Sequence, residues 1–311
     1  MEVINLNQDL MKSNLGQTNK WINFKKIIKR YDIAYLFIMP TILYLLVFQL
    51  YPIIESVRLS FTDLSFLRIN SGSFVGLKNY KELLFNDSDF WRIVRNSFLW
   101  TLGSTTFQYL LAIPAALILN QKIKFRSIWR GLMMIPWVTP TVIMGLIWKW
   151  IYDGDYGLIN YYLNTNIVWL GNPSTVWPSI LLASTWKGLP FATIMVLAGL
   201  QVIPNQLYEA AYIDGCSKFQ AFFKITLPNL KPILAVLIMI SIILTWTKFE
   251  MIWVLTAGGP GLKTSILPTY IYTKSFEYFE MGLGSAVAVL SMSIMIIFIV
   301  LYYKLLKKYQ D

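Results

Sequence analysis

The sequence contains no histidine and only one cysteine, Cys216. Without histidine or a second thiol, the chain lacks the ligands of a zinc site, a thiol–histidine catalytic pair and any internal disulfide. Charge is also scarce, because Asp, Glu, Lys and Arg make up 14% of the residues, whereas about 25% is usual in soluble domains. We therefore expect no metal site and no catalytic site on this chain.

Apolar residues account for 56% of the chain, which is typical of a membrane protein. The net charge of +11 is then explained by basic cytoplasmic loops and does not indicate nucleic-acid binding. Six apolar segments approach the ~20 residues needed to cross the hydrocarbon core of a bilayer. We expect an all-α integral membrane protein with spans at 33–50, 97–119, 132–151, 179–200, 233–256 and 283–303.

The distribution of lysine and arginine predicts the orientation of these spans. Basic residues gather in alternate segments, at 1–32, 121–130, 204–231 and 304–311, and such segments face the cytoplasm. Residues 1–32 form a basic leader, in which aromatic and apolar residues at helical spacing favour an interfacial helix over 21–31. A disordered leader fits the first twenty residues equally well. We expect both termini, including the tail at 304–311, to be cytoplasmic.

The polar segment at 204–228, between two apolar runs, is predicted to be a helix-turn-helix. Pro204 and Asn205 open the first helix, and Gly215 ends it. Ser217 and Gln220 form a capping box that opens the second helix, and Leu227-Pro228 is expected to end it. An amphipathic hairpin on the inner surface is the plainer alternative. Exposed apolar residues instead favour docking to a partner, and the segment contains Leu207, Tyr208, Phe219, Phe222 and Phe223.

The spacing in this segment resembles the EAA loop of binding-protein-dependent ABC importer permeases, which reads E-A-A-x3-G-x9-I-x-L-P. In such permeases the loop docks on a separate ATPase. The resemblance implies a coupling role for Glu209, Ala210, Ala211, Asp214, Gly215, Phe219, Phe222, Phe223, Ile225, Leu227 and Pro228.

A second resemblance, to sugar permeases of the maltose, oligosaccharide and glycerol-phosphate type, lies later in the chain. It rests on the T-x-G-G-P turn at 256–260 and on Gly-Leu-Pro-Phe at 188–191, and it extends over about residues 33–308. It implies half of a heterodimeric pore that imports a carbohydrate by alternating access. The implied partners are a second homologous permease, two copies of an ATPase, an extracytoplasmic solute-binding protein and the lipid bilayer of a bacterial cell membrane.

The chain contains no Walker A motif, G-x-x-x-x-G-K-[ST]. ATP and Mg²⁺ are therefore expected on the separate ATPase, with no cofactor on this chain.

The sugar-permease resemblance also implies residues that line the substrate path. By position these are Lys187, Gly188, Phe191, Ser241, Leu244, Thr245 and Lys248. The last four recur at i, i+3, i+4 and i+7, which places them on one face of a continuous helix. The two lysines depart from the neutral maltose-type site. They favour an acidic sugar or a sugar phosphate, such as glycerol-3-phosphate or a uronate oligosaccharide, unless they pair with Glu250 or with carboxylates of a partner.

Functions of other classes fit the sequence less well. An ion-coupled secondary transporter needs internal symmetry and its own intramembrane carboxylates, and no clear repeat of halves is visible. An intramembrane enzyme would need paired catalytic side chains, which the spans do not supply.

Overall fold

The computed structural model describes residue 35 and residues 37–308. The predicted leader at 1–32 lies outside these residues. Within them the chain is helical, and its β structure amounts to one isolated bridge between Thr62 and Phe74. The chain divides into two compact units, Met1–Arg58 and Leu59–Asp311, and each is described by itself.

The first unit contains most of a 24-residue apolar helix, Phe37–Ser60. It includes a π-helical turn, η1 (Leu46–Leu50), followed directly by α2 (Tyr51–Ser60). The helix therefore continues beyond residue 50, where the sequence predicted the end of the span. Pro52 lies inside this helix, directly after the π-helical turn, where the regular ladder of i→i−4 hydrogen bonds is already interrupted.

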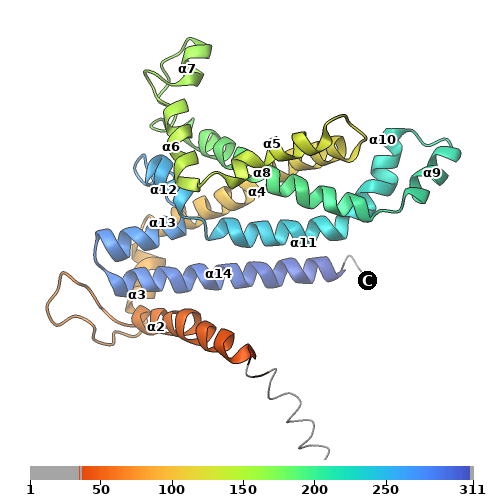
Figure 1. The fold of residues 1–311 in the computed structure, drawn as a ribbon. Helices are drawn as coiled ribbons and strands as arrows, with labels where there is room; N and C mark the ends of the chain where they lie inside the picture. The colour runs from red at the N-terminus through yellow and green to blue at the C-terminus, as the bar shows by residue number, and fades with distance from the viewer. Residues whose placement is uncertain (1–34, 36, 309–311) are drawn as a thin grey trace, which may run out of the picture. The chain divides into compact units, whose positions relative to one another are not determined.

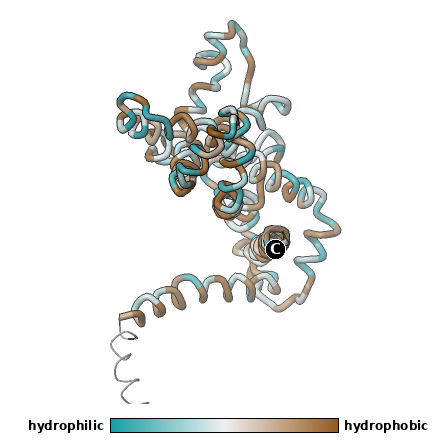
Figure 2. The backbone as a smooth tube through the Cα atoms, turned by 90° about the vertical axis from the view of Figure 1, so that its right-hand side faces the viewer, coloured by the Kyte–Doolittle hydropathy of each residue, from teal (hydrophilic) through white to brown (hydrophobic). Residues whose placement is uncertain are grey.

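The second unit is a helical bundle with short helices at both ends (Figure 1). Its long helices are α4 (Phe90–Asn120), α8 (Val176–Val202), α11 (Leu227–Trp246) and α14 (Met281–Lys308). Figure 2 views α14 nearly end-on behind the C-terminus, and the turns in view are mostly apolar. The remaining elements are α3 (Lys78–Lys81), η2 (Glu82–Asn86), α5 (Arg126–Val138), α6 (Thr141–Ile151), α7 (Leu158–Leu163), α9 (Asn205–Ile213), α10 (Lys218–Ala221), η3 (Phe222–Thr226), α12 (Glu250–Thr256), α13 (Leu267–Tyr272) and η4 (Thr273–Glu277).

The helices α4 and α8 lie side by side through the middle of this unit (Figure 1). Small residues allow the close approach. A Cβ added to Gly103 would lie 3.1 Å from Leu181, and one added to Gly188 would overlap the side chain of Gln108. Buried apolar clusters around Trp100, Val196 and Ile242 then join this helix pair to α6, α11 and α14.

The span predicted at 132–151 is not one continuous helix. The chain bends by 90° between α5 and α6, and the pair is either one broken span or a re-entrant loop. The break falls at Thr139-Pro140, because proline disfavours helical backbone in the residue before it, and Thr139 has ψ of 128°. Pro114, Pro136 and Pro190 lie inside continuous helices. With the other five membrane-length helices of the described residues, the bent pair gives up to six spans.

The span predicted at 233–256 is also interrupted. Helix α11 ends at Trp246, and α12 begins at Glu250. The break coincides with two polar residues, Thr247 and Lys248, and the Trp100 indole N–H donates to the Thr245 carbonyl at 3.1 Å. That bond occupies a carbonyl that the helix terminus leaves without an intrahelical partner.

Candidate functional site

The segment 204–228 forms the predicted helix-turn-helix at one end of the bundle (Figure 1). Helix α9 ends as expected, because Gly215 takes a left-handed conformation with φ of +80°. The Gly215 amide donates to the Tyr212 carbonyl at 3.1 Å, and the Cys216 amide donates to the Ala211 carbonyl at 2.8 Å. Glycine adopts this conformation without the steric cost that a side chain brings.

The predicted capping box at the start of α10 is confirmed. The Gln220 amide donates to Ser217 Oγ at 3.3 Å, and the Ser217 amide donates to Gln220 Oε1 at 2.8 Å. The predicted end of the second helix at Leu227-Pro228 is wrong, because α10 continues through η3 directly into α11. Pro228 lies in the first turn of α11, where its missing N–H is tolerated.

This helix-turn-helix has an anchored side and an exposed side. Tyr208, Ile225 and Leu227 pack against a buried cluster of α4, α8 and α11, and the Tyr208 hydroxyl lies 3.0 Å from Thr226 Oγ1. The apolar side chains of the other side are exposed, with Phe219 at 73% and Ile213 at 85%. The exposed residues also include Glu209, Ala210, Asp214 and Phe223, whereas Ala211 and Phe222 are half-buried. A rigidly anchored apolar surface of this kind suits docking to another protein.

Lys187 on α8 contacts the break between α5 and α6. Its ammonium donates to the Thr139 carbonyl at 2.6 Å and to the Trp137 carbonyl at 3.4 Å. Carbonyls at a helix C-terminus carry partial negative charge, so a cation there is favourable. Phe191, one turn further along α8, stacks on Trp137 with ring centroids 5.7 Å apart. Lys187 and Phe191 therefore bind α8 to the end of α5.

Of the four residues predicted to share one helix face, Ser241, Leu244 and Thr245 lie on α11 and Lys248 lies beyond its end. Thr245 is buried at 1% exposure, whereas Leu244 is 52% exposed. Ser241 Oγ lies 2.9 Å from the Tyr109 hydroxyl of α4. Lys248 follows the end of α11, because the helix stops at Trp246, and its side chain is exposed.

Three charged side chains nevertheless come together around this break. Lys187, Lys248 and Glu250 lie close enough to influence one another electrostatically. The ion pairs of the described chain within 4.0 Å include none of these three residues. Five of the seven predicted path residues thus fall into two groups. Gly188, Ser241 and Thr245 sit in helix contacts, whereas Lys187 and Lys248 belong to a charged cluster beside the two helix breaks.

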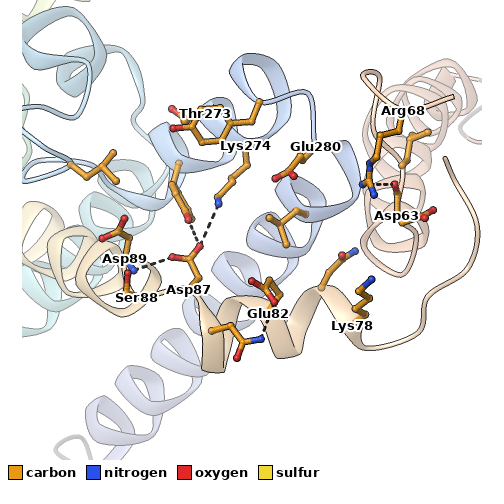
Figure 3. Close-up of a pocket in the computed structure, with 17 residues that line it drawn as sticks. Asp63, Arg68, Lys78, Glu82, Asp87, Ser88, Asp89, Thr273, Lys274 and Glu280 are labelled. Carbon is orange, nitrogen blue, oxygen red and sulfur yellow. Dashed lines mark hydrogen bonds and ion pairs between the residues drawn. The ribbon is translucent and has the colours of Figure 1, made fainter.

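The sequence did not predict a second polar site, at the opposite end of the bundle from α9 and α10. A pocket of about 570 Å³ lies between the loop after α2, the α3–η2 segment, and α13 with η4 (Figure 3). Carboxylates outnumber cations five to three in its lining: Asp63, Glu82, Asp87, Asp89 and Glu280 face Arg68, Lys78 and Lys274.

Asp87 is the centre of the contacts in this pocket. One carboxylate oxygen accepts from the Asp89 amide at 2.9 Å and from the Phe90 amide at 3.2 Å, so it caps the start of α4. The other accepts from the Tyr270 hydroxyl and lies 3.4 Å from Lys274 Nζ. Burial raises the pKa of Asp87, but the hydrogen bonds and the lysine outweigh it and hold the pKa below its ordinary value. The only sequence signal at this pocket is an aspartate, Asp87, ahead of an apolar run. That pattern indicates a helix cap and gives no sign of a pocket.

Comparison with known proteins gives consistent matches. The family model described as the inner membrane component of binding-protein-dependent transport systems matches residues 108–311. The trehalose/maltose transport system permease protein MalF of Thermococcus litoralis is 38% identical, over 88% of this chain and 92% of that protein. The sulfoquinovosyl glycerol transport system permease protein SmoG of Agrobacterium fabrum is 33% identical, over 88% and 90%.

A solved structure shows the same fold. A chain of a bacterial ABC transporter that imports the acidic polysaccharide alginate superposes with a TM-score of 0.82. It is 23% identical, and the match covers 93% of this chain and all of that one. The resemblance inferred from the EAA spacing and the T-x-G-G-P turn is thereby confirmed.

Proposed function

Because this chain belongs to the family of binding-protein-dependent transport inner membrane components, we propose that it forms half of the pore of an ATP-driven carbohydrate importer. The observation that carries the proposal is the similarity to two permeases named for sugar transport, each over 88% of this chain. The chain is a membrane permease subunit, so ATP hydrolysis belongs to a separate subunit.

The segment 204–228 is the proposed contact with that ATPase. Its exposed apolar side would seat on the ATPase, while Tyr208, Ile225 and Leu227 pass the movement to α8 and α11. ATP-driven closure of two ATPase copies would then move this segment and turn the pore outward. Such coupling requires a rigid element with two arrangements, and the Gly215 turn with the Ser217 capping box supplies the rigidity.

The second permease and the solute-binding protein complete the proposed assembly. A binding protein delivers the sugar from outside, and the acidic pocket around Asp87 lies on the end of the bundle opposite the coupling segment (Figure 1). The positive residues at 121–130 and 204–231 support an orientation with both termini in the cytoplasm of a bacterial cell.

Substitution of Gly215 tests the coupling proposal. A Cβ at Gly215 would meet no atom within 4 Å, so the first atom of a side chain causes no clash, and leucine and asparagine are compared here for their tolerance of positive φ. In proteoliposomes with both permeases, the ATPase and the binding protein, we expect Gly215→Leu to lower uptake about tenfold while the complex still assembles. Gly215→Asn should stay within about twofold of the parent, because asparagine visits this conformation. Normal uptake by Gly215→Leu would contradict the proposal.

An acidic sugar is the second candidate substrate, and the exposed Lys248 favours it. Lys187 already donates to two carbonyls, so it needs no anionic solute, whereas none of the described ion pairs includes Lys248. We expect Lys248→Met to reduce uptake of a uronate or a sugar phosphate strongly while the solute-binding protein keeps its affinity. Lys187→Met should impair neutral and acidic solutes alike, because it frees the end of α5. A neutral sugar taken up at full rate by Lys248→Met would return the proposal to ordinary oligosaccharide import.

A further inference from the structure

An open apolar groove runs between α4, α5 and α8, and it shares no lining residue with the pocket around Asp87. Its volume is about 570 Å³, and no charged residue lines it. The walls include Ile118, Trp129, Leu132, Trp186 and Pro190. The first three of these side chains are each more than half exposed. Along α5 the groove extends from Trp129 to Pro136, which is about 10 Å at 1.5 Å per residue.

A basic cluster stands at the α4–α5 turn, where the groove begins. Gln121–Arg130 contains Lys122, Lys124, Arg126 and Arg130. On α5, Arg126, Trp129, Arg130 and Met133 recur at i, i+3, i+4 and i+7, so they lie on one side of the helix. Trp129 and Met133 of this series line the groove. The two arginines therefore adjoin its apolar walls.

These arginines lack partners in the described part of the chain. The Nε atom of Arg126 and the Nε and Nη2 atoms of Arg130 are buried without a hydrogen bond, and none of the ion pairs found includes either residue. A buried guanidinium donor left without an acceptor is costly. The start of α5 also has no side-chain cap, so its first-turn amides add a favourable field for an anion.

We propose that this groove binds an acyl chain of an anionic phospholipid, with the lipid phosphate held by Arg126 and Arg130. Guanidinium groups match phosphate oxygens in a planar, two-point geometry. Basic pockets between membrane helices on the cytoplasmic side bind anionic head groups, and the basic residues at 121–130 predict that side here. Neither a soluble anion nor a neutral lipid uses both the apolar walls and the arginines.

The test is lipid binding by the full-length chain, delipidated and then exposed to nanodiscs of phosphatidylcholine with or without phosphatidylglycerol. Co-purified lipid is counted by native mass spectrometry after extraction from the nanodiscs. We expect retained phosphatidylglycerol in the parent, and a loss of about tenfold or more in apparent affinity for Arg126→Gln/Arg130→Gln. Lys122→Gln/Lys124→Gln removes the same charge from the same segment and should change affinity by less than about threefold.

A second variant tests the apolar half of the site. Ala115 lines the groove from α4, and Ala115→Leu fills part of it without changing charge. We expect this variant to lose phosphatidylglycerol as the arginine pair does. Equal losses in the lysine and arginine pairs would overturn the proposal by showing general electrostatic attraction. The proposal would also be overturned if Ala115→Leu retained its lipid but failed to pair with the second permease. That result would assign the groove to the subunit interface.

Discussion

Removing the Asp87 carboxylate should destabilise the end of the bundle that carries α13. In Asp87→Ala, α4 loses its cap, for which about 0.5–2 kcal/mol is usual. The Tyr270 hydroxyl loses a charged acceptor, worth about 1.5–3 kcal/mol. Lys274, whose side chain is 16% exposed, loses its carboxylate and keeps only the aromatic rings of Tyr270 and Tyr278.

The expected total is about 3–5 kcal/mol, in the range for breaking a largely buried ion pair. In detergent this should lower the melting temperature by about 10 °C, at about 2–4 °C per kcal/mol. Asp87→Asn keeps an oxygen for the cap and loses the charge, so about half of the effect should remain. Asp87→Asn/Lys274→Met should cost less than the two single changes added, because they remove one shared contact. A melting temperature for Asp87→Ala within 2 °C of the parent, as a rough limit, would refute this reasoning.

The same contacts predict a dependence on pH. The pKa of Asp87 is lower in the folded chain than its ordinary value. Its contribution is therefore fully present above the unfolded pKa of about 3.9 and is lost as the pH falls through the folded value. The difference in melting temperature between the parent and Asp87→Asn should be constant from pH 8 to about pH 5 and shrink below about pH 4.

Three further outcomes follow from the fold. In a Cys216→Ser background, a cysteine at exposed Asn86 should react with an impermeant maleimide from outside intact cells, and one at exposed Asn120 should not; the reverse pattern would invert the topology. Gly188→Ala should push aside the Gln108 amide, which donates to a carbonyl of α8. The cost should be about 1–3 kcal/mol in the free energy of unfolding, measured by thermal unfolding. Adding Gln108→Ala should restore part of the loss. Ser217→Ala should remove the cap of α10 and cost about 1 kcal/mol, seen as faster hydrogen exchange at 218–221, with no change in the bundle.

Local sequence signals predicted the structure well where one turn decides the outcome. Gly215 and Ser217 were read correctly because a left-handed glycine and a capping box involve only neighbouring residues. The same kind of reasoning failed at Pro228, because a π-helical turn ahead of it lets the helix continue. It also failed at Trp246, where α11 ends beside the Trp100 indole of α4, which donates to Thr245, 145 positions later in the chain. The contact between Asp87 and Tyr270 spans 183 positions and has no local signature.

The charged side chain of Lys187, inside an apolar span, has a structural role that its position in the sequence does not reveal. In the sequence, the resemblance to sugar permeases places this cation in the substrate path. In the fold, α5 ends at Thr139-Pro140, so the carbonyls of Trp137 and Thr139 have no donor within the helix. The Lys187 ammonium donates to both of them. These two hydrogen bonds satisfy donors of the ammonium, so Lys187 has a structural role without an anionic solute. The choice between a neutral and an acidic sugar therefore rests on Lys248, and uptake by Lys248→Met decides it independently of the contact that holds α5 to α8.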